Sequence, residues 1–300
     1  MFFGIIAMIL VGLSWIIDGV VVGRAPKLNL SISSIMLVGS FGCFAGNLIA
    51  VIVTGGFNAP PSALAIVTLI CVIMGIANYL QLDFMSRAMQ NGPNGVIWSV
   101  VQSAFLFQVL MSIIFFGETK TALNYVGLTS ILTSLVLFGF LKENRTTGPW
   151  RLMMLLSFLS TIVSQCSSVI PSHYPNLSKV SSPFKVAVFF LTMALCGLIA
   201  KAVKNRAFLK EIVEDTKMPG FWTNCASMYI PFGTVEAILY FPGINSLKQA
   251  NATVLAMPLM MCSCIIGFQA VAILFLHEKC SGLQWVALSL CLVGIVLFCI

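Results

Sequence analysis

Long apolar segments with few charged residues follow one another along almost the whole sequence. A helix needs about 20 apolar residues to cross the hydrocarbon core of a bilayer, and ten segments of about that length are present. In hydrocarbon, backbone amides must bond within their own segment or in a closed barrel, and these segments lack the period-two alternation of barrel strands. The sequence therefore predicts an all-α polytopic membrane protein.

The ten predicted transmembrane helices are joined by short connections that carry the turn and charge signals. They cover residues 2–22, 32–53, 63–84, 95–116, 122–141, 150–170, 184–204, 220–241, 253–276 and 282–300. The longest connection, residues 204–219, is the only stretch whose composition looks properly solvated.

Composition narrows the classes of function. Charged residues make up 8% of the chain, against roughly 25% in soluble domains. The net charge of +7 arises from single or short clusters of basic residues between apolar runs, which excludes nucleic acid as a partner and makes the lipid bilayer the expected one. Most of the ten cysteines lie inside apolar spans, and with only two histidines we expect neither a metal site nor a cofactor.

An internal repeat divides the predicted spans into two halves. At an offset of 160 residues, the segment 117–138 aligns with 277–298, and 8 of 22 positions are identical. Glu118 and Glu278 occupy the same place in a predicted helical hairpin. Residues 1–143 and 144–300 would each contain five spans, so the second half enters the membrane from the opposite face. The prediction is a 5+5 inverted repeat, the arrangement that carriers use to alternate between two open states.

The two hairpins also resemble a known family. FFGETKTALNYVGL and FLHEKCSGLQWVAL are similar to the paired hairpin of the drug/metabolite transporter (DMT) superfamily, in particular its ten-helix EamA-like members. The resemblance implies a secondary transporter of a small metabolite, such as a sugar, an amino acid or a related polar solute. It also implies alternating access in a bacterial cytoplasmic (inner) membrane.

Acidic residues within the predicted spans are the first candidates for function, because a charge in the bilayer is costly unless it has a role. Asp18 and Glu236 lie inside the first and eighth spans and could bind a proton or another cation; the alternative is a carboxyl that reaches the interface or pairs with a basic neighbour. Asp83 precedes Arg87 by four residues, the spacing of a helical ion pair. We expect Glu118 and Glu278 to cap or fix the hairpin turns rather than contact substrate.

Uncharged polar and aromatic side chains complete the candidate binding site. Amides near span centres must face the interior, where they bond a polar solute or one another; they are Asn78, Gln102, Gln165, Asn224 and Gln269. Trp15 and Tyr229 could stack on a ring of the substrate or pack in the core. Pro231 predicts a bend in the eighth helix.

Other classes of function remain as alternatives. A lipid flippase or an accessory membrane subunit of the same fold is compatible with the composition. An intramembrane enzyme is the least favoured class, because no nucleophile–base, metal or nucleotide motif is present. Twelve basic residues in alternate loops face four in the others, and the positive-inside rule then places both termini outside.

Overall fold

The computed structural model describes residues 1–116, 121–139, 149–240, 242–243, 246–247, 256–275, 277 and 281–299. These residues form helices and connections, with no strand among them. In chain order the elements are α1 (Phe2–Arg24), η1 (Ala25–Leu28), α2 (Ile32–Thr54), α3 (Pro61–Asn91), α4 (Asn94–Gln102), α5 (Phe105–Phe116), α6 (Ala122–Gly139), α7 (Trp150–His173), α8 (Pro175–Ser178), α9 (Ser182–Lys204), α10 (Phe208–Thr216), α11 (Phe221–Val235), η2 (Glu236–Tyr240), α13 (Ala256–Leu274) and α14 (Gly282–Cys299).

Every predicted span falls on one helix or on two consecutive helical segments of the described residues, but the number of helices able to cross a membrane differs from ten. Seven helices are long and apolar enough, and they begin at Phe2, Ile32, Pro61, Asn94, Trp150, Ser182 and Ala256. The expected fifth, eighth and tenth spans are not among the seven. The eighth falls short because α11 has 15 residues before the chain enters the π-helical turn η2. The protein is thus a polytopic α-helical membrane protein with seven candidate spans in its described part.

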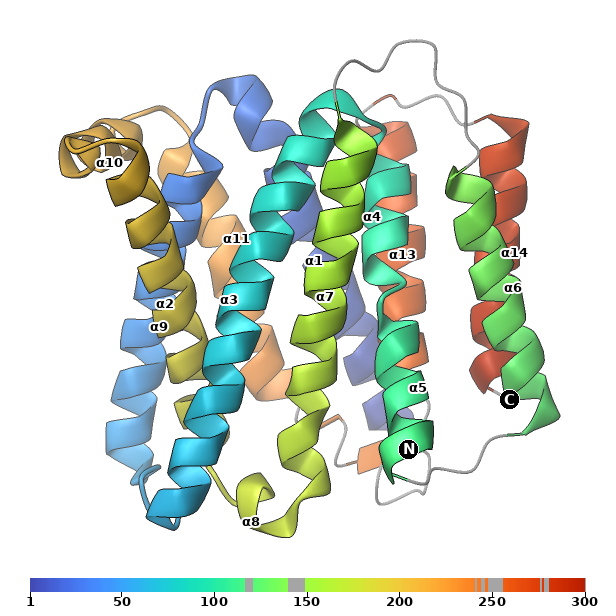
Figure 1. Ribbon diagram of the computed structural model, residues 1–300, viewed down its shortest axis with the longest axis horizontal. Helices are drawn as coiled ribbons and strands as arrows, with labels where there is room; N and C mark the ends of the chain where they lie inside the picture. Colours follow the sequence, from blue (N-terminus) through green and yellow to red (C-terminus); the bar gives the residue numbers. More distant parts are fainter. Residues whose placement is uncertain are drawn as a thin grey trace.

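The long helices run side by side between two ends of one bundle (Figure 1). α1 begins and α14 ends at the lower end in this view. α5 ends and α6 begins at the lower end, whereas α13 ends and α14 begins at the upper end. The helix ends that flank residues 117–120 therefore lie at the opposite end of the bundle from those that flank residues 276–281.

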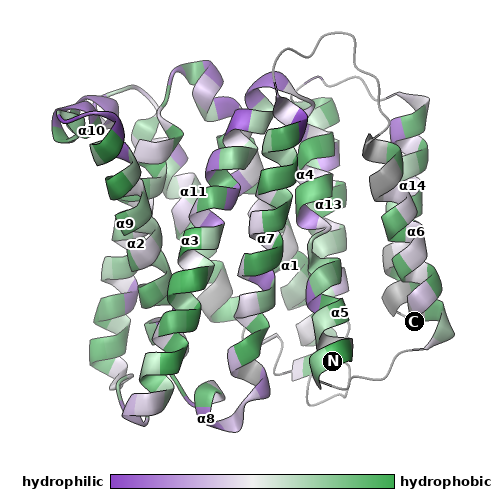
Figure 2. Ribbon diagram, viewed as in Figure 1, coloured by the Kyte–Doolittle hydropathy of each residue, from purple (hydrophilic) through white to green (hydrophobic). Residues whose placement is uncertain are grey.

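Charge separates the same two ends. The upper end, here called the basic end, is where α1, α3 and α9 finish and α7 starts (Figure 1). It carries Arg24, Lys27, Arg87, Arg151, Lys201, Lys204, Arg206, Lys210 and Lys217, whereas the described residues at the lower end supply Lys179 and Lys185. Figure 2 shows hydrophobic residues along the helices and hydrophilic ones toward their ends.

Helix packing joins segments far apart in the sequence. α6 packs on α14, α2 on α9, α3 on α7 and α9, and α1 on α11 and α13. When the first five long helical segments are exchanged for the second five, each of these pairs maps onto a pair that is also in contact. Close approach depends on glycine: at Gly75 of α3 a methyl group would lie 2.7 Å from Thr192 of α9.

Two large buried cores lie in the bundle, and a smaller one joins the start of α3 to the α8 region. One large core gathers side chains of α1, α2, α3, α4, α9, α11 and α13, including Trp98, Phe190 and Phe268; the other large core lies between α1, α4, α5, α13 and α14. Trp15 of α1 packs against both large cores. α1 therefore crosses the middle of the molecule, where a side chain can meet both groups of helices.

Candidate functional site

Asp18 is a buried carboxyl in the middle of this bundle, with 8% of its surface exposed. It lies on α1, close enough to Tyr229 of α11 and Cys264 of α13 to act on them electrostatically. The structure therefore brings together Asp18 and Tyr229, two of the residues that the sequence selects. A carboxylate held among packed helices from both halves of the chain is the natural centre of a polar site.

Tyr229 contacts α2 through its hydroxyl and its ring. Its side chain is buried, and Ser40 of α2 donates a hydrogen bond to the Tyr229 hydroxyl at 3.3 Å. The ring lies against Gly39, where a methyl group would overlap it. Glycine at this position lets α2 and α11 approach around the aromatic ring.

Two indole N–H groups close to this region lack a strong hydrogen-bond acceptor among the described residues. They belong to Trp15 of α1 and Trp98 of α4; both nitrogens are buried, and the Trp98 N–H faces the Cys264 thiol, a weak acceptor. The Trp98 ring stacks on Phe268 of α13 at 4.8 Å between centroids, and the Trp15 ring stacks on Phe232 of α11 at 6.4 Å. Buried donors without strong acceptors are costly, so these groups could donate to an acceptor-rich ligand.

Gly19 explains how α1 comes so close to the tryptophan. A methyl group at this position, next to Asp18, would lie 2.8 Å from the Trp98 ring and 2.5 Å from Phe268. Only glycine fits there without moving a buried ring. The approach places the Asp18 backbone beside the stacked Trp98–Phe268 pair.

Gln269 is the predicted amide that lies nearest to this group of rings. It follows Phe268 on α13, is 8% exposed, and its amide occupies the space that a side chain on Gly95 of α4 would need. α4 and α13 are thus in close contact through a glycine. We define the central site as Trp15, Asp18, Ser40, Trp98, Tyr229 and Gln269.

The other predicted amides lie on separate helices. Gln102, 3% exposed, ends α4 just before the break at Ser103 and Ala104 that separates α4 from α5. Asn78 of α3 donates to Gln81 one turn later at 3.4 Å. Gln165 of α7 has a buried Oε1 without a hydrogen-bond partner among the described residues.

Asn224 does not lie near the centre of its helix, where the sequence predicted it, and its role in binding stays a prediction. This residue lies in the first turn of α11, and its amide donates to the Gly220 carbonyl at 2.8 Å, so it serves the start of the helix rather than the middle of the bundle. The sequence-based limits began this span at residue 220 without resolving which residues formed its exposed first turn.

The side chains of three predicted acids are outside the described part of the structure. Glu236 begins the π-helical turn η2 after Pro231, but its side chain is outside the described part, as are Glu118 and Glu278 entirely.

The predicted ion pair of Asp83 with Arg87 is confirmed, at 2.6 Å. Among the described residues no group of three or more His, Cys, Asp or Glu side chains could hold a metal ion.

A groove of about 570 Å³ lies between α2 and α11. Its α2 wall includes Gly39, Gly42 and Gly46, and its α11 wall includes Trp222 and Tyr229. Trp222 is 60% exposed, so the groove opens on the outer face of the bundle and reaches the buried Tyr229 ring at its inner side. It is therefore an apolar recess next to the central site.

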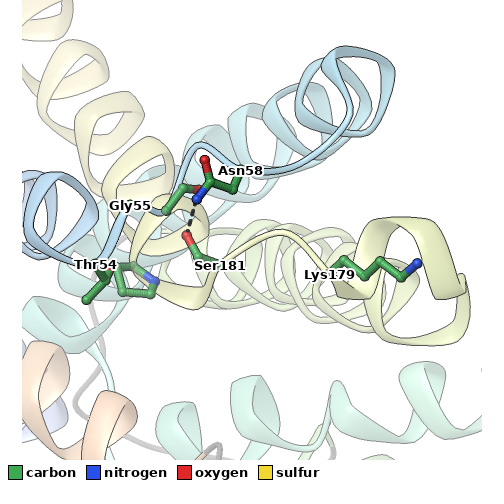
Figure 3. Close-up of a pocket in the computed structure, with 7 residues that line it drawn as sticks. Thr54, Gly55, Asn58, Lys179 and Ser181 are labelled. Atoms are coloured by element: carbon green, nitrogen blue, oxygen red, sulfur yellow. Dashed lines mark hydrogen bonds between the residues drawn. The ribbon is translucent and has the colours of Figure 1, made fainter.

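A second hollow, of about 430 Å³, lies at the lower end between the α2–α3 and α8–α9 connections. Figure 3 shows the Ser181 hydroxyl pointing to the α2–α3 connection and the Lys179 side chain extending away from it. Ser181 donates to the Gly56 carbonyl at 3.1 Å. The bond ties two connections together, and Lys179 is exposed, so this hollow has the character of a loop junction.

A charged cluster at the basic end joins three helices. Lys201 of α9 is buried, and its Nζ donates to Glu211 at 2.7 Å and to Asp215 at 3.1 Å, both on α10. Ser34 of α2 donates to the same Asp215 carboxylate. The hydrogen bond from Lys201 lowers the pKa of Glu211 below its usual value of 4.5, because it favours the charged form.

Comparison with known proteins identifies a fold but no family. No protein-family model matches the sequence, and no curated protein matches it. A solved protein, described only as "Crystal structure of protein", superposes with a TM-score of 0.58 and 15% identity over 97% of this chain and 95% of that chain. At that identity the likeness concerns the fold alone.

Several residues of the central site carry no distinctive signal in the sequence. Ser40, Trp98 and Phe268 stand in helices that are apolar on most sides, so no stripe indicates which face is internal. Gly39 and Gly19 are the detectable hints, because glycine within a span allows close packing. Their partners become known only when helices from both halves are placed together.

Proposed function

We propose that the protein is a secondary transporter that carries a small polar metabolite across a membrane by alternating access. The observation that supports this most is the central site, where Asp18 and two buried indole N–H groups without strong acceptors lie between helices of both halves. A polar site at the interface of two helix groups, in the middle of a membrane bundle, is the arrangement that carriers use.

The proposed architecture is a ten-helix 5+5 inverted repeat of the DMT superfamily, EamA-like type. The opposite placement of the helix ends that flank residues 117–120 and residues 276–281 supports it (Figure 1), as does the exchange of helix pairs between halves. In this arrangement the α6 and α14 segments and the α11–η2 segment also cross the bilayer. The positive-inside rule then puts the basic end in the cytoplasm and both termini outside.

The chemistry of the site favours a solute with both ring faces and hydrogen-bond acceptors. Trp15, Trp98 and Tyr229 offer aromatic surfaces, and the indole N–H groups can donate to hydroxyl or carboxylate oxygens. A sugar, an amino acid or a related polar solute meets these requirements. Asp18 supplies a group that can take up a proton or pair with another cation during the cycle.

A lipid flippase is the second candidate, and the groove between α2 and α11 is the observation that favours it. A lipid must enter from the bilayer, and this groove opens sideways beside Tyr229. An accessory membrane subunit would need neither the central site nor the groove between α2 and α11. An enzyme remains the least favoured class.

Counterflow in proteoliposomes tests these functions against one another. Vesicles containing purified protein are preloaded with an unlabelled sugar or amino acid, and entry of the labelled form is followed with and without a pH gradient. Trans-stimulated entry supports the carrier. Movement of a labelled phospholipid alone would replace the carrier by the flippase, and movement of neither across a broad solute panel would contradict both.

A further inference from the structure

α10 lies across the basic end of the bundle rather than along it. In Figure 1 it is seen almost end-on, beside the ends of α2 and α9, so its axis runs across the direction of the long helices. Lys201, Glu211 and Asp215 hold it there through two ion pairs. The helix is therefore fixed by one face at the level where α9 ends and α11 begins.

A second face of α10 is apolar and uncovered. Leu209 and Val213, one turn apart, are 64% and 52% exposed. Phe208 and Ile212 continue the apolar arc toward the bundle, whereas the acidic residues lie on the other side of the helix. A short helix with one apolar and one charged face, held across the end of a membrane bundle, has the form of an interfacial membrane helix.

The charges around α10 are mainly positive once its ion pairs are taken into account. Glu211 and Asp215 are engaged by Lys201, which leaves Glu214 as the remaining acid of the helix, 4.0 Å from Lys210. The exposed basic side chains on and beside α10 are Lys204, Arg206, Lys210 and Lys217. Basic residues at the membrane surface attract acidic lipid headgroups.

We propose that α10 is an interfacial helix that binds anionic phospholipid headgroups through these four basic residues, with Leu209 and Val213 inserted among the acyl chains. The position of the helix, its apolar face and its excess positive charge together select a lipid surface over an aqueous protein partner. Because Lys201 and Ser34 bond to the same helix, the lipid contact stabilises the ends of α9 and α2. The inference does not depend on what the protein transports.

Thermal unfolding of the full chain in detergent micelles tests the lipid contact. A thiol-reactive dye reports unfolding, because Cys71, Cys225 and Cys264 are buried free thiols. Phosphatidylglycerol should raise the Tm by about 2–4 °C more than phosphatidylcholine does, as expected for a ligand that binds only the folded state. Changing all four basic residues to Gln should remove this difference, and the matched change Lys179→Gln at the opposite end should preserve it.

The readout is the difference between the two lipids, so a variant with a lower starting Tm still gives a decisive result. The paired change Leu209→Ser and Val213→Ser should at least halve the rise in Tm given by phosphatidylglycerol. An equal rise with both lipids, or a full difference in the four-residue variant, would overturn the proposal. An equal rise with glycerol phosphate would do so too, because it would identify a site for a free anion.

Discussion

The seam between α3 and α7 is closely packed, whereas the seam between α1 and α11 is not. In the first, Ser157 of α7 donates to the Gln81 carbonyl of α3 at 2.9 Å, and Trp150 covers Gly92 where α3 ends. In the second, Trp15 meets Phe232 across 6.4 Å, and the groove between α2 and α11 lies alongside. In the proposed repeat these two seams are equivalent by symmetry. Their different packing therefore corresponds to one of the two open states of the proposed transport cycle.

A carrier with two equivalent seams would change state by exchanging their packing. The α1–α11 seam would close over the central site while the α3–α7 seam loosened. In this scheme the residues that act in transport lie at the α1–α11 seam, and the α3–α7 seam supports the bundle. Four substitution experiments test that assignment, in order of expected effect.

The largest effect is expected at Asp18, the carboxyl of the central site. Asp18→Asn keeps the shape of the side chain and removes the carboxylate, and gradient-driven uptake should fall about 10- to 100-fold, because a charged hydrogen bond contributes about 1.5–3 kcal/mol. Ser157→Ala on α7 is the comparison, and it should reduce uptake much less because it removes one uncharged hydrogen bond of the α3–α7 seam. Equal losses in the two variants, measured in proteoliposomes, would end the distinction between the seams.

The next effect concerns two glycines of α2. Gly39→Ala would push a methyl group into the buried Tyr229 ring, and such overpacking destabilises by about 1–3 kcal/mol. Gly42→Ala is the matched control, since no described atom lies within 4 Å of the added methyl group. Unfolding followed by the thiol-reactive dye should lower the Tm of the first variant only. A normal Tm for Gly39→Ala would mean that the seam is looser than described.

A smaller effect is expected for the Ser40–Tyr229 hydrogen bond. Tyr229→Phe and Ser40→Ala should each destabilise by about 0.5–1.5 kcal/mol, and the double variant should add little to either. A double-mutant cycle on unfolding measures this coupling. Strictly additive losses would show that the two hydroxyls do not act as a pair.

The smallest effect is expected in the pH dependence of stability, through Glu211 at the basic end. The folded pKa of Glu211 is below 4.5 because Lys201 bonds the carboxylate. Its stabilising effect is therefore complete above the unfolded pKa and is lost as the pH falls through the folded one. Melting temperature should decrease below about pH 4.5 with a weaker slope in Glu211→Gln. An unchanged slope in that variant would assign the acid sensitivity to other carboxyls.

The positions of the helices are predictable from this sequence because apolar length and short connections determine them. Asp83 and Arg87 were also predictable, since a pair four residues apart on one helix needs no tertiary information. The amphipathic α10 was not expected, because its charged residues resemble those of a solvated connection. Its helical form depends on the anchoring of Glu211 and Asp215 by Lys201, which is a contact between elements.

Part of the central site was predictable from the sequence. Asp18, Tyr229 and Gln269 are polar or amphipathic residues within apolar spans, and the structure buries all three. The position of Asn224 along its helix was not predictable, because the first turn of a helix and its middle look alike when the preceding residues are also uncharged. The expected irregularity at Pro231 is followed by a π-helical turn from Glu236 to Tyr240, a local rearrangement that composition does not specify.

The pairing of α6 with α14 has a consequence for biosynthesis. Gly294 of α14 lies against the backbone of Gly127 in α6, and Ser134 donates to the Ala287 carbonyl at 2.6 Å. If α6 crosses the bilayer as proposed, about 140 residues remain to be translated between the end of α6 and the start of this partner. The small-residue face of α6 then has no α14 to pack on, so the α6–α14 pair forms only after α14 has been synthesised.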